Sequence, residues 1–227
     1  MTAMLLMEPT VNVFGPRSTT RRNKSVRARL SKVATARDTI EGFDRDNDLL
    51  GLTYGQFSLL DLIDATLELT GPADVVISTW SAGFYDVEEA VRWRDSGRML
   101  STRFVMDSSD KRRQSTPGDV AELFGPENVR TFRSHAKFVL ISNDAGWRIC
   151  ITTSMNLNLN PRLEQFEMTD DADRFDFMMQ FVDACFAELP AGDTQDRTLP
   201  GLPGLVSVQP NVAIQMAPAI AVGLWDQ

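Results

Sequence analysis

The stretch RSHAKFVLISNDAGWRICITTSMN, residues 133–156, contains the single histidine of the chain, His135. Two apolar runs within it are separated by the turn-forming residues 144–146, and this pattern predicts an antiparallel hairpin. Alternate residues of a strand share one face. We therefore expect His135 and Lys137 to project together from the start of the first strand.

The second run of this hairpin ends in polar residues, of which Ser154 and Asn156 share one face. If the strands pair about the turn, these two side chains return to the level of His135 and Lys137. Lysine supplies charge, serine and asparagine supply neutral hydrogen bonds, and imidazole can attack phosphorus or move a proton. The four side chains predict a phosphate site. The alternative interpretation of His135 is a partly exposed polar residue without a special role.

The segments HAK, residues 135–137, and TSMN, residues 153–156, resemble the HKD signature of the phospholipase D superfamily. In that signature, His-x-Lys is followed at a distance by Gly-Ser/Gly-x-Asn. The resemblance covers about residues 54–190. It implies the α-β-α sandwich of that superfamily.

The resemblance also implies roles for individual residues. His135 matches the nucleophile that forms a phosphohistidine, and an acid beyond the motif supports the histidine of a facing motif. We take Glu164 as that acid, with Glu167 as the alternative. The implied catalytic residues are His135, Lys137, Asn156 and Glu164, and the implied phosphate-binding residues are Lys137, Ser154 and Asn156.

Two positions depart from the signature. Its aspartate should fall at position 142, where this chain has Ser142, and its glycine before Ser154 is replaced by Thr153, which we expect to crowd the phosphate. These departures favour a second hypothesis, a catalytically weak or inactive phospholipase D-like protein that serves as a nucleic-acid-binding or structural assembly subunit. The intact histidine, lysine, serine and asparagine favour a phosphodiesterase. Without the hairpin, a plain α/β binding domain would remain.

The chain contains no second His-x-Lys. Members of the superfamily need two facing motifs, because one histidine attacks and the other protonates the leaving oxygen. The resemblance therefore implies a homodimer with the site across a two-fold axis. The resemblance implies no metal and no cofactor. It also predicts that the cleavage rate depends on pH in a bell-shaped manner.

Charge is distributed unevenly along the chain. The net charge is −8 for 227 residues, yet eight basic residues and no acidic residue lie between Arg17 and Arg37. Clustered Lys and Arg give sequence-independent affinity for nucleic acid, and the alternative is a solvated arm. We favour a nucleic acid backbone as substrate, DNA rather than RNA. The expected contacts are Arg21, Arg22, Lys24, Arg27, Arg112, Arg113 and Arg133, with Arg130 beside them.

Helical and strand patterns alternate along residues 51–190. This order predicts an α/β sandwich with a mixed, mainly parallel sheet, to which the hairpin adds antiparallel pairing. Residues 1–50 are expected to form a basic extension that includes a short helix over 27–40. Residues 191–227 are expected to form an apolar Pro/Gly-rich tail that lies against its own domain or a partner subunit.

The two cysteines, Cys150 and Cys185, lie in apolar runs without metal-ligand spacing. They are expected to be buried, reduced thiols, which favours a cytoplasmic protein. We expect neither a signal peptide nor a membrane span.

Overall fold

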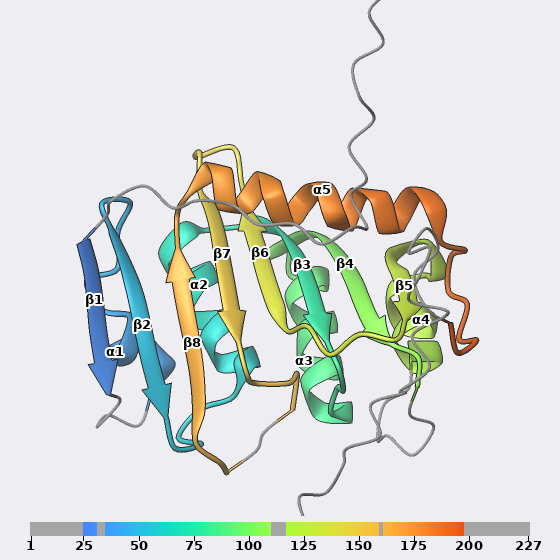
Figure 1. Ribbon diagram of the computed structural model, residues 1–227, viewed down its shortest axis with the longest axis horizontal. Coiled ribbons are helices and arrows are strands. Elements are labelled where there is room, and N and C mark those ends of the chain that lie inside the picture. The colour runs from blue at the N-terminus through green and yellow to red at the C-terminus, as the bar shows by residue number, and fades with distance from the viewer. Residues whose placement is uncertain (1–24, 31–34, 110–116, 159–160, 198–227) are drawn as a thin grey trace, which may run out of the picture.

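The computed structural model describes residues 25–30, 35–109, 117–158 and 161–197. An eight-stranded sheet, in the order β1-β2-β8-β7-β6-β3-β4-β5, lies between helices on both faces (Figure 1). The predicted α-β-α sandwich is confirmed. The strands are β1 (Ser25–Leu30), β2 (Asn47–Thr53), β3 (Ala73–Thr79), β4 (Met99–Asp107), β5 (Val129–Phe132), β6 (Phe138–Ser142), β7 (Arg148–Thr153) and β8 (Glu164–Thr169). The helices are α1 (Ala36–Ile40), α2 (Leu59–Thr70), α3 (Phe84–Asp95), α4 (Pro117–Phe124), the 3-10 turn η1 (Pro126–Asn128) and α5 (Ala172–Glu188).

Two apolar cores lie on opposite faces of the sheet. In β6, Val139 and Ile141 belong to the core shared with α1 to α4, whereas Phe138 and Leu140 belong to the core shared with α5. This alternation follows from the period of two residues in a strand. Helix α5 therefore covers one face, and the other helices cover the opposite face (Figure 1).

The sheet is mixed, as predicted, but it contains more antiparallel pairing than expected. The pairs β1–β2, β3–β4 and β4–β5 are parallel, and the pairs β2–β8, β8–β7, β7–β6 and β6–β3 are antiparallel. The hairpin formed by residues 138–153 lies inside the sheet. Both of its strands also pair antiparallel with their outer neighbours, β6 with β3 and β7 with β8.

Part of the expected extension over residues 1–50 is built into the sheet, because β1 and β2 form one side of it. The helix expected over residues 27–40 is wrong in its first part, which is β1. The backbone pairing of β1 with β2 outweighs the helical propensity of this segment. Helix α1 begins only at Ala36, where the Thr35 hydroxyl accepts a hydrogen bond from the Asp38 N–H at 3.1 Å. The expected apolar tail beyond residue 197 lies outside the described residues.

Strands β6 and β7 form the predicted hairpin. Phe138 pairs with Thr152, and Ser142 pairs with Arg148. At the turn, Gly146 has φ 86°, a conformation that glycine adopts without Cβ strain. The open end of the hairpin lies where β3 and β4 end, at the lower edge of the sheet in Figure 1.

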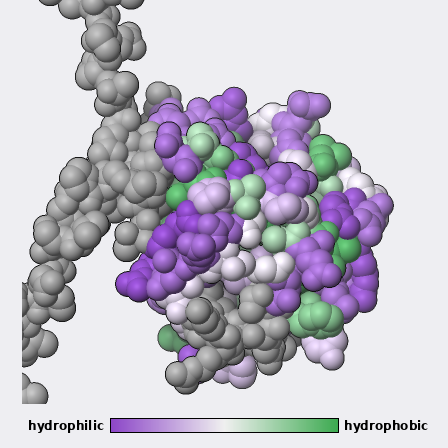
Figure 2. All heavy atoms as spheres, turned by 90° about the vertical axis from the view of Figure 1, so that its right-hand side faces the viewer, coloured by the Kyte–Doolittle hydropathy of each residue, from purple (hydrophilic) through white to green (hydrophobic). Residues whose placement is uncertain are grey.

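The edge strand β5 is covered by the segment that follows α5. The Arg133 N–H donates to the Arg197 carbonyl at 2.7 Å, and the Gly192 N–H donates to the Val129 carbonyl at 3.1 Å. Seen from this side, hydrophobic residues form separate patches among hydrophilic ones (Figure 2). None of the described helices is long and apolar enough to cross a membrane.

Both cysteines are free thiols in the core between α5 and the sheet, Cys150 on β7 and Cys185 on α5 itself. Burial raises the pKa of Cys150 to about 12 and that of Cys185 to about 12. At neutral pH both side chains are therefore protonated, and they act as apolar packing residues.

Candidate phosphate site

The polar residues at the open end of the hairpin lie where several strand ends meet. Strands β3, β4 and β7 end at this edge of the sheet, and β6 and β8 begin there (Figure 1). The Thr153 N–H donates to the Lys137 carbonyl at 3.2 Å, and the Ser154 N–H donates to the Gln165 carbonyl at 3.1 Å. The chain segments 135–137 and 154–156 are therefore neighbours.

His135 and Lys137 lie in a loop before β6 rather than in the strand itself. Side chains hold this loop: Ser78 Oγ donates to the Ala136 carbonyl at 3.0 Å, and Ser134 Oγ accepts from the Ala136 N–H at 3.2 Å. The Lys137 ammonium lies 3.4 Å from each ring nitrogen of His135 and donates to the His135 carbonyl at 3.0 Å. An anion bound here would meet the ammonium and the imidazole together.

Asp107, the last residue of β4, is a buried residue of this edge that the sequence analysis did not identify. Its carboxylate accepts from the Ser134 N–H at 2.7 Å and from the Ser109 N–H at 2.9 Å. It thereby ties the loop that carries His135 to the end of β4. The available signal was its position at the carboxyl end of an apolar strand, where functional residues gather in α/β sheets.

Lys137 is partly buried near two carboxylates, those of Glu164 and Asp107. Burial lowers the pKa of its ammonium, and the negative charges of Glu164 and Asp107 oppose that shift. The two carboxylates therefore help to keep this lysine protonated. His135 is exposed, and its ring lies 6.0 Å from the Trp80 ring between centroids.

Ser154 and Glu164 are bonded directly. Ser154 Oγ donates to the Glu164 carboxylate and accepts from the Gln165 N–H at 3.0 Å. Thr153 was expected to crowd the phosphate, but its hydroxyl forms hydrogen bonds within the segment that joins β7 to β8. That hydroxyl donates to the Gln165 carbonyl at 2.7 Å and accepts from the Met155 N–H at 3.0 Å. The threonine therefore fixes the loop that carries Ser154.

Asn156 contributes a buried polar atom. Its side-chain oxygen is inaccessible to solvent and has no hydrogen-bond partner among the residues that the structure describes. A buried polar atom without a protein partner indicates a place for a water or a ligand group. Asn156 lines a small recess with Phe57, Ser58, Met155, Asn158 and Glu164.

Two residues considered in the sequence analysis lie away from this edge. The Glu167 carboxylate is paired with Arg174 at 2.8 Å, further along β8. Ser142 is at the turn end of β6, five residues from Lys137 in nearly extended chain, or about 16 Å at the rise of a strand. Ser142 therefore lies outside the candidate phosphate site.

Most of the expected nucleic-acid contacts lie outside the described residues, namely Arg21, Arg22, Lys24, Arg112 and Arg113. For Arg27, the structure describes only the backbone pairing with Leu49. Arg133 is exposed and donates to the Asp196 carboxylate at 2.8 and 2.6 Å, which raises the pKa of its guanidinium. Arg130 is buried, 4.4 Å from the centroid of the Phe186 ring. The expectation that Arg130 contacts nucleic acid is therefore wrong.

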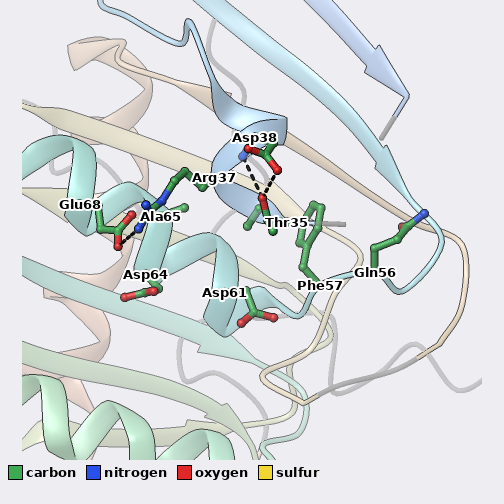
Figure 3. Close-up of a pocket in the computed structure, with 10 residues that line it drawn as sticks. Thr35, Arg37, Asp38, Gln56, Phe57, Asp61, Asp64, Ala65 and Glu68 are labelled. Atoms are coloured by element: carbon green, nitrogen blue, oxygen red, sulfur yellow. Dashed lines mark hydrogen bonds and ion pairs between the residues drawn. The ribbon is translucent and has the colours of Figure 1, made fainter. Parts of the chain in front are cut away.

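A larger hollow, of about 480 Å³, lies beside α1 and α2. Figure 3 shows the carboxylates of Asp61, Asp64 and Glu68 around it, with Arg37 bonded to Glu68. The excess of acid in this hollow opposes the binding of a phosphate. Among the described residues, no group of three or more His, Cys, Asp or Glu is arranged to hold a metal ion.

Comparisons with known proteins give likenesses of fold. No family model and no curated protein matches the chain. NucT from Helicobacter pylori is 15% identical with a TM-score of 0.46, over 63% of this chain and 99% of NucT. Nuc from Salmonella typhimurium, a phospholipase D family member, is 9% identical with a TM-score of 0.44, over 63% of this chain and 96% of Nuc. Polyphosphate kinase from Porphyromonas gingivalis is 13% identical with a TM-score of 0.48, over 66% of this chain and 28% of the kinase chain.

These likenesses concern the fold alone, since all three TM-scores are below 0.5 and the highest identity is 15%.

Proposed function

We propose that the protein is a metal-independent phosphodiesterase that cuts a nucleic acid backbone through a phosphohistidine intermediate. The observation that carries this proposal is the grouping of His135, Lys137, Ser154 and Asn156 at one edge of the sheet. These side chains supply a nucleophile, a positive charge and hydrogen bonds to phosphate oxygens. Glu164, bonded to Ser154, is the proposed supporting acid.

The proposed reaction has two displacements at phosphorus. A ring nitrogen of His135 first attacks, the N–P bond forms, and the P–O bond to the leaving oxygen breaks. A second imidazole gives a proton to the leaving oxygen. Water then attacks phosphorus, the N–P bond breaks, and the second imidazole takes a proton from that water.

The second imidazole is proposed to be the partner subunit's His135. His135 is the only histidine of the chain and it is exposed, so a second copy can approach it. A two-fold axis through the site would put the two imidazoles on opposite sides of the phosphorus atom. Because they need opposite protonation states, the rate should fall at both ends of the pH range.

Nucleic acid is the proposed source of the phosphodiester, with DNA rather than RNA as the first substrate to test. The body of the protein is acidic, whereas residues 17–37 carry eight basic residues and no acid. Such a segment gives the protein a sequence-independent affinity for a polyanion. An acidic body alone would repel the substrate from the site.

Cleavage in the presence of EDTA tests this proposal. The full chain and a His135→Ala variant are incubated with plasmid and with oligonucleotides, and their oligomeric states are measured by light scattering. The expected result is metal-independent cutting by a dimer, with the cutting lost in the variant. Thr153 at the glycine position favours the second candidate, a nucleic-acid-binding subunit. Equal DNA retention by both proteins without cutting would support that candidate, and a monomer would contradict the shared site.

A further inference from the structure

Three aromatic side chains are exposed among the described residues, and all three lie at the edge of the sheet that carries the candidate phosphate site. Tyr54 is 56% exposed, Phe84 is 49% exposed and Tyr85 is 82% exposed. Single apolar residues scattered over a surface need no explanation, but rings that gather beside a functional site do.

The first ring lies on the β8 side of the site. Tyr54 directly follows Thr53, the last residue of β2, and Thr53 pairs with Glu164 at the start of β8. Glu164 is bonded to Ser154. Tyr54 therefore lies one residue beyond Thr53, the β2 residue that pairs with the proposed supporting acid Glu164.

The other two rings lie on the β3 side of the site. Phe84 and Tyr85 begin α3, and their rings meet edge to face with centroids 5.8 Å apart. The residue before them, Gly83, donates its N–H to the Leu157 carbonyl at 2.7 Å, next to Asn156 in the chain. The start of α3 is therefore attached directly to the asparagine loop of the site.

Trp80, which precedes this aromatic pair in the chain, lies beside the histidine. Its ring lies 6.0 Å from the His135 ring. Tyr85 is five residues beyond Trp80 in the chain, so the Cα atoms of the two residues are at most about 17 Å apart. The pair Phe84 and Tyr85 and the histidine therefore fall within the span of one short oligonucleotide.

We infer that Tyr54, Phe84 and Tyr85 stack on unpaired bases of a single-stranded nucleic acid whose backbone phosphate lies at His135. This inference rests on the proposed function and adds the strandedness of its substrate. Bases in a duplex stack on one another, whereas unpaired bases offer a free face to a protein ring. Stacking tolerates any sequence, because every base has such a face. The rings would thus select single strands without selecting a sequence.

Binding to three oligonucleotides tests the inference. Full-length His135→Ala protein, used as a non-cutting background, is titrated by fluorescence anisotropy with a short single strand, its duplex, and an abasic strand of the same length. Adding Tyr85→Ala should weaken single-strand binding roughly tenfold and leave abasic-strand binding unchanged. Tyr85→Phe should restore the affinity. The matched control is Leu100→Ala, since Leu100 is 60% exposed near the start of β4, at the opposite edge.

The outcomes separate this inference from the proposed function. If Tyr85→Ala lowers the affinity equally for the abasic and the normal strand, or lowers neither affinity, the proposed role of the rings is overturned. A change from dimer to monomer on Tyr85→Ala would also overturn it, because the rings would then contact a second copy of the chain. A loss of affinity for the normal strand alone supports the inference. It does so even if the wild-type protein fails to cut DNA, because that failure would overturn only the proposed phosphodiesterase activity.

Discussion

The two ends of the β6–β7 hairpin both carry polar residues, but they use them differently. At the turn end, the Asn143 amide donates to the carbonyls of Thr70 at 2.9 Å and Pro72 at 3.3 Å. Arg148 pairs with Asp176 at 3.2 Å. These polar groups connect the hairpin to other parts of the fold.

At the open end, some polar groups also fasten the chain, as Ser78 does by donating to the Ala136 carbonyl, but the Lys137 ammonium bonds within its own loop. The Lys137 ammonium contacts the ring of its neighbour His135. Within the described part of the chain, the Asn156 side-chain oxygen has no hydrogen-bond partner at all. The comparison shows that polarity at a strand end does not by itself mark a site. The end whose donors and charges converge on a small volume is the one suited to a ligand.

The largest expected effect separates the two ends by activity. Replacing the open-end cation in Lys137→Met should reduce the cleavage rate by about 10²–10³-fold, because a charge that stabilises the transferring phosphoryl group is lost. The matched control is Arg148→Met at the turn end, which should leave the rate per folded molecule unchanged. Rates measured under single-turnover conditions, with circular dichroism to establish folding, check both variants. Equal losses in the two variants would contradict the distinction.

The next effect separates the ends by stability. Asn143→Ala removes hydrogen bonds to Thr70 and Pro72 and should lower the free energy of unfolding by about 1–3 kcal/mol. Its oligonucleotide affinity should not change. Urea denaturation gives the first quantity and anisotropy the second. A loss of affinity without a loss of stability would show that the turn end also serves binding.

The smallest effect concerns pH. The Glu164 charge opposes the lowering of the Lys137 pKa that burial causes. Glu164→Gln should therefore lower that pKa further, so the ammonium loses its proton, and binding weakens, at a lower pH than in the wild-type protein. The measurement is oligonucleotide affinity against pH in the His135→Ala background. If the fall in affinity at alkaline pH stays at the same pH in Glu164→Gln, or moves to a higher pH, Glu164 does not act on Lys137.

Much of this arrangement follows from the sequence because it depends on local pattern. The apolar runs on either side of residues 144–146 predict the hairpin, and the hairpin alone brings Lys137 and Ser154 to neighbouring positions. The sandwich follows in the same way from the alternation of helix and strand patterns.

The remaining features depend on contacts between distant segments. Asp107 reaches the site only because β4 lies beside β3 in the sheet. The strand β1 forms only because β2 supplies a partner, so a basic segment with helical propensity becomes a strand. The exposed rings of Tyr54 and Tyr85 are far apart in sequence, and only the sheet brings them to one edge.

Trapping the covalent intermediate tests the central claim most directly. The full chain is mixed with an oligonucleotide in EDTA, quenched into alkali during the first turnover, and analysed by peptide mass spectrometry. The account predicts a phosphoryl-linked nucleotide on the peptide that contains His135, and no adduct on the corresponding peptide of the His135→Ala variant. Cutting that continues in the variant, or an adduct on any other side chain, would contradict it.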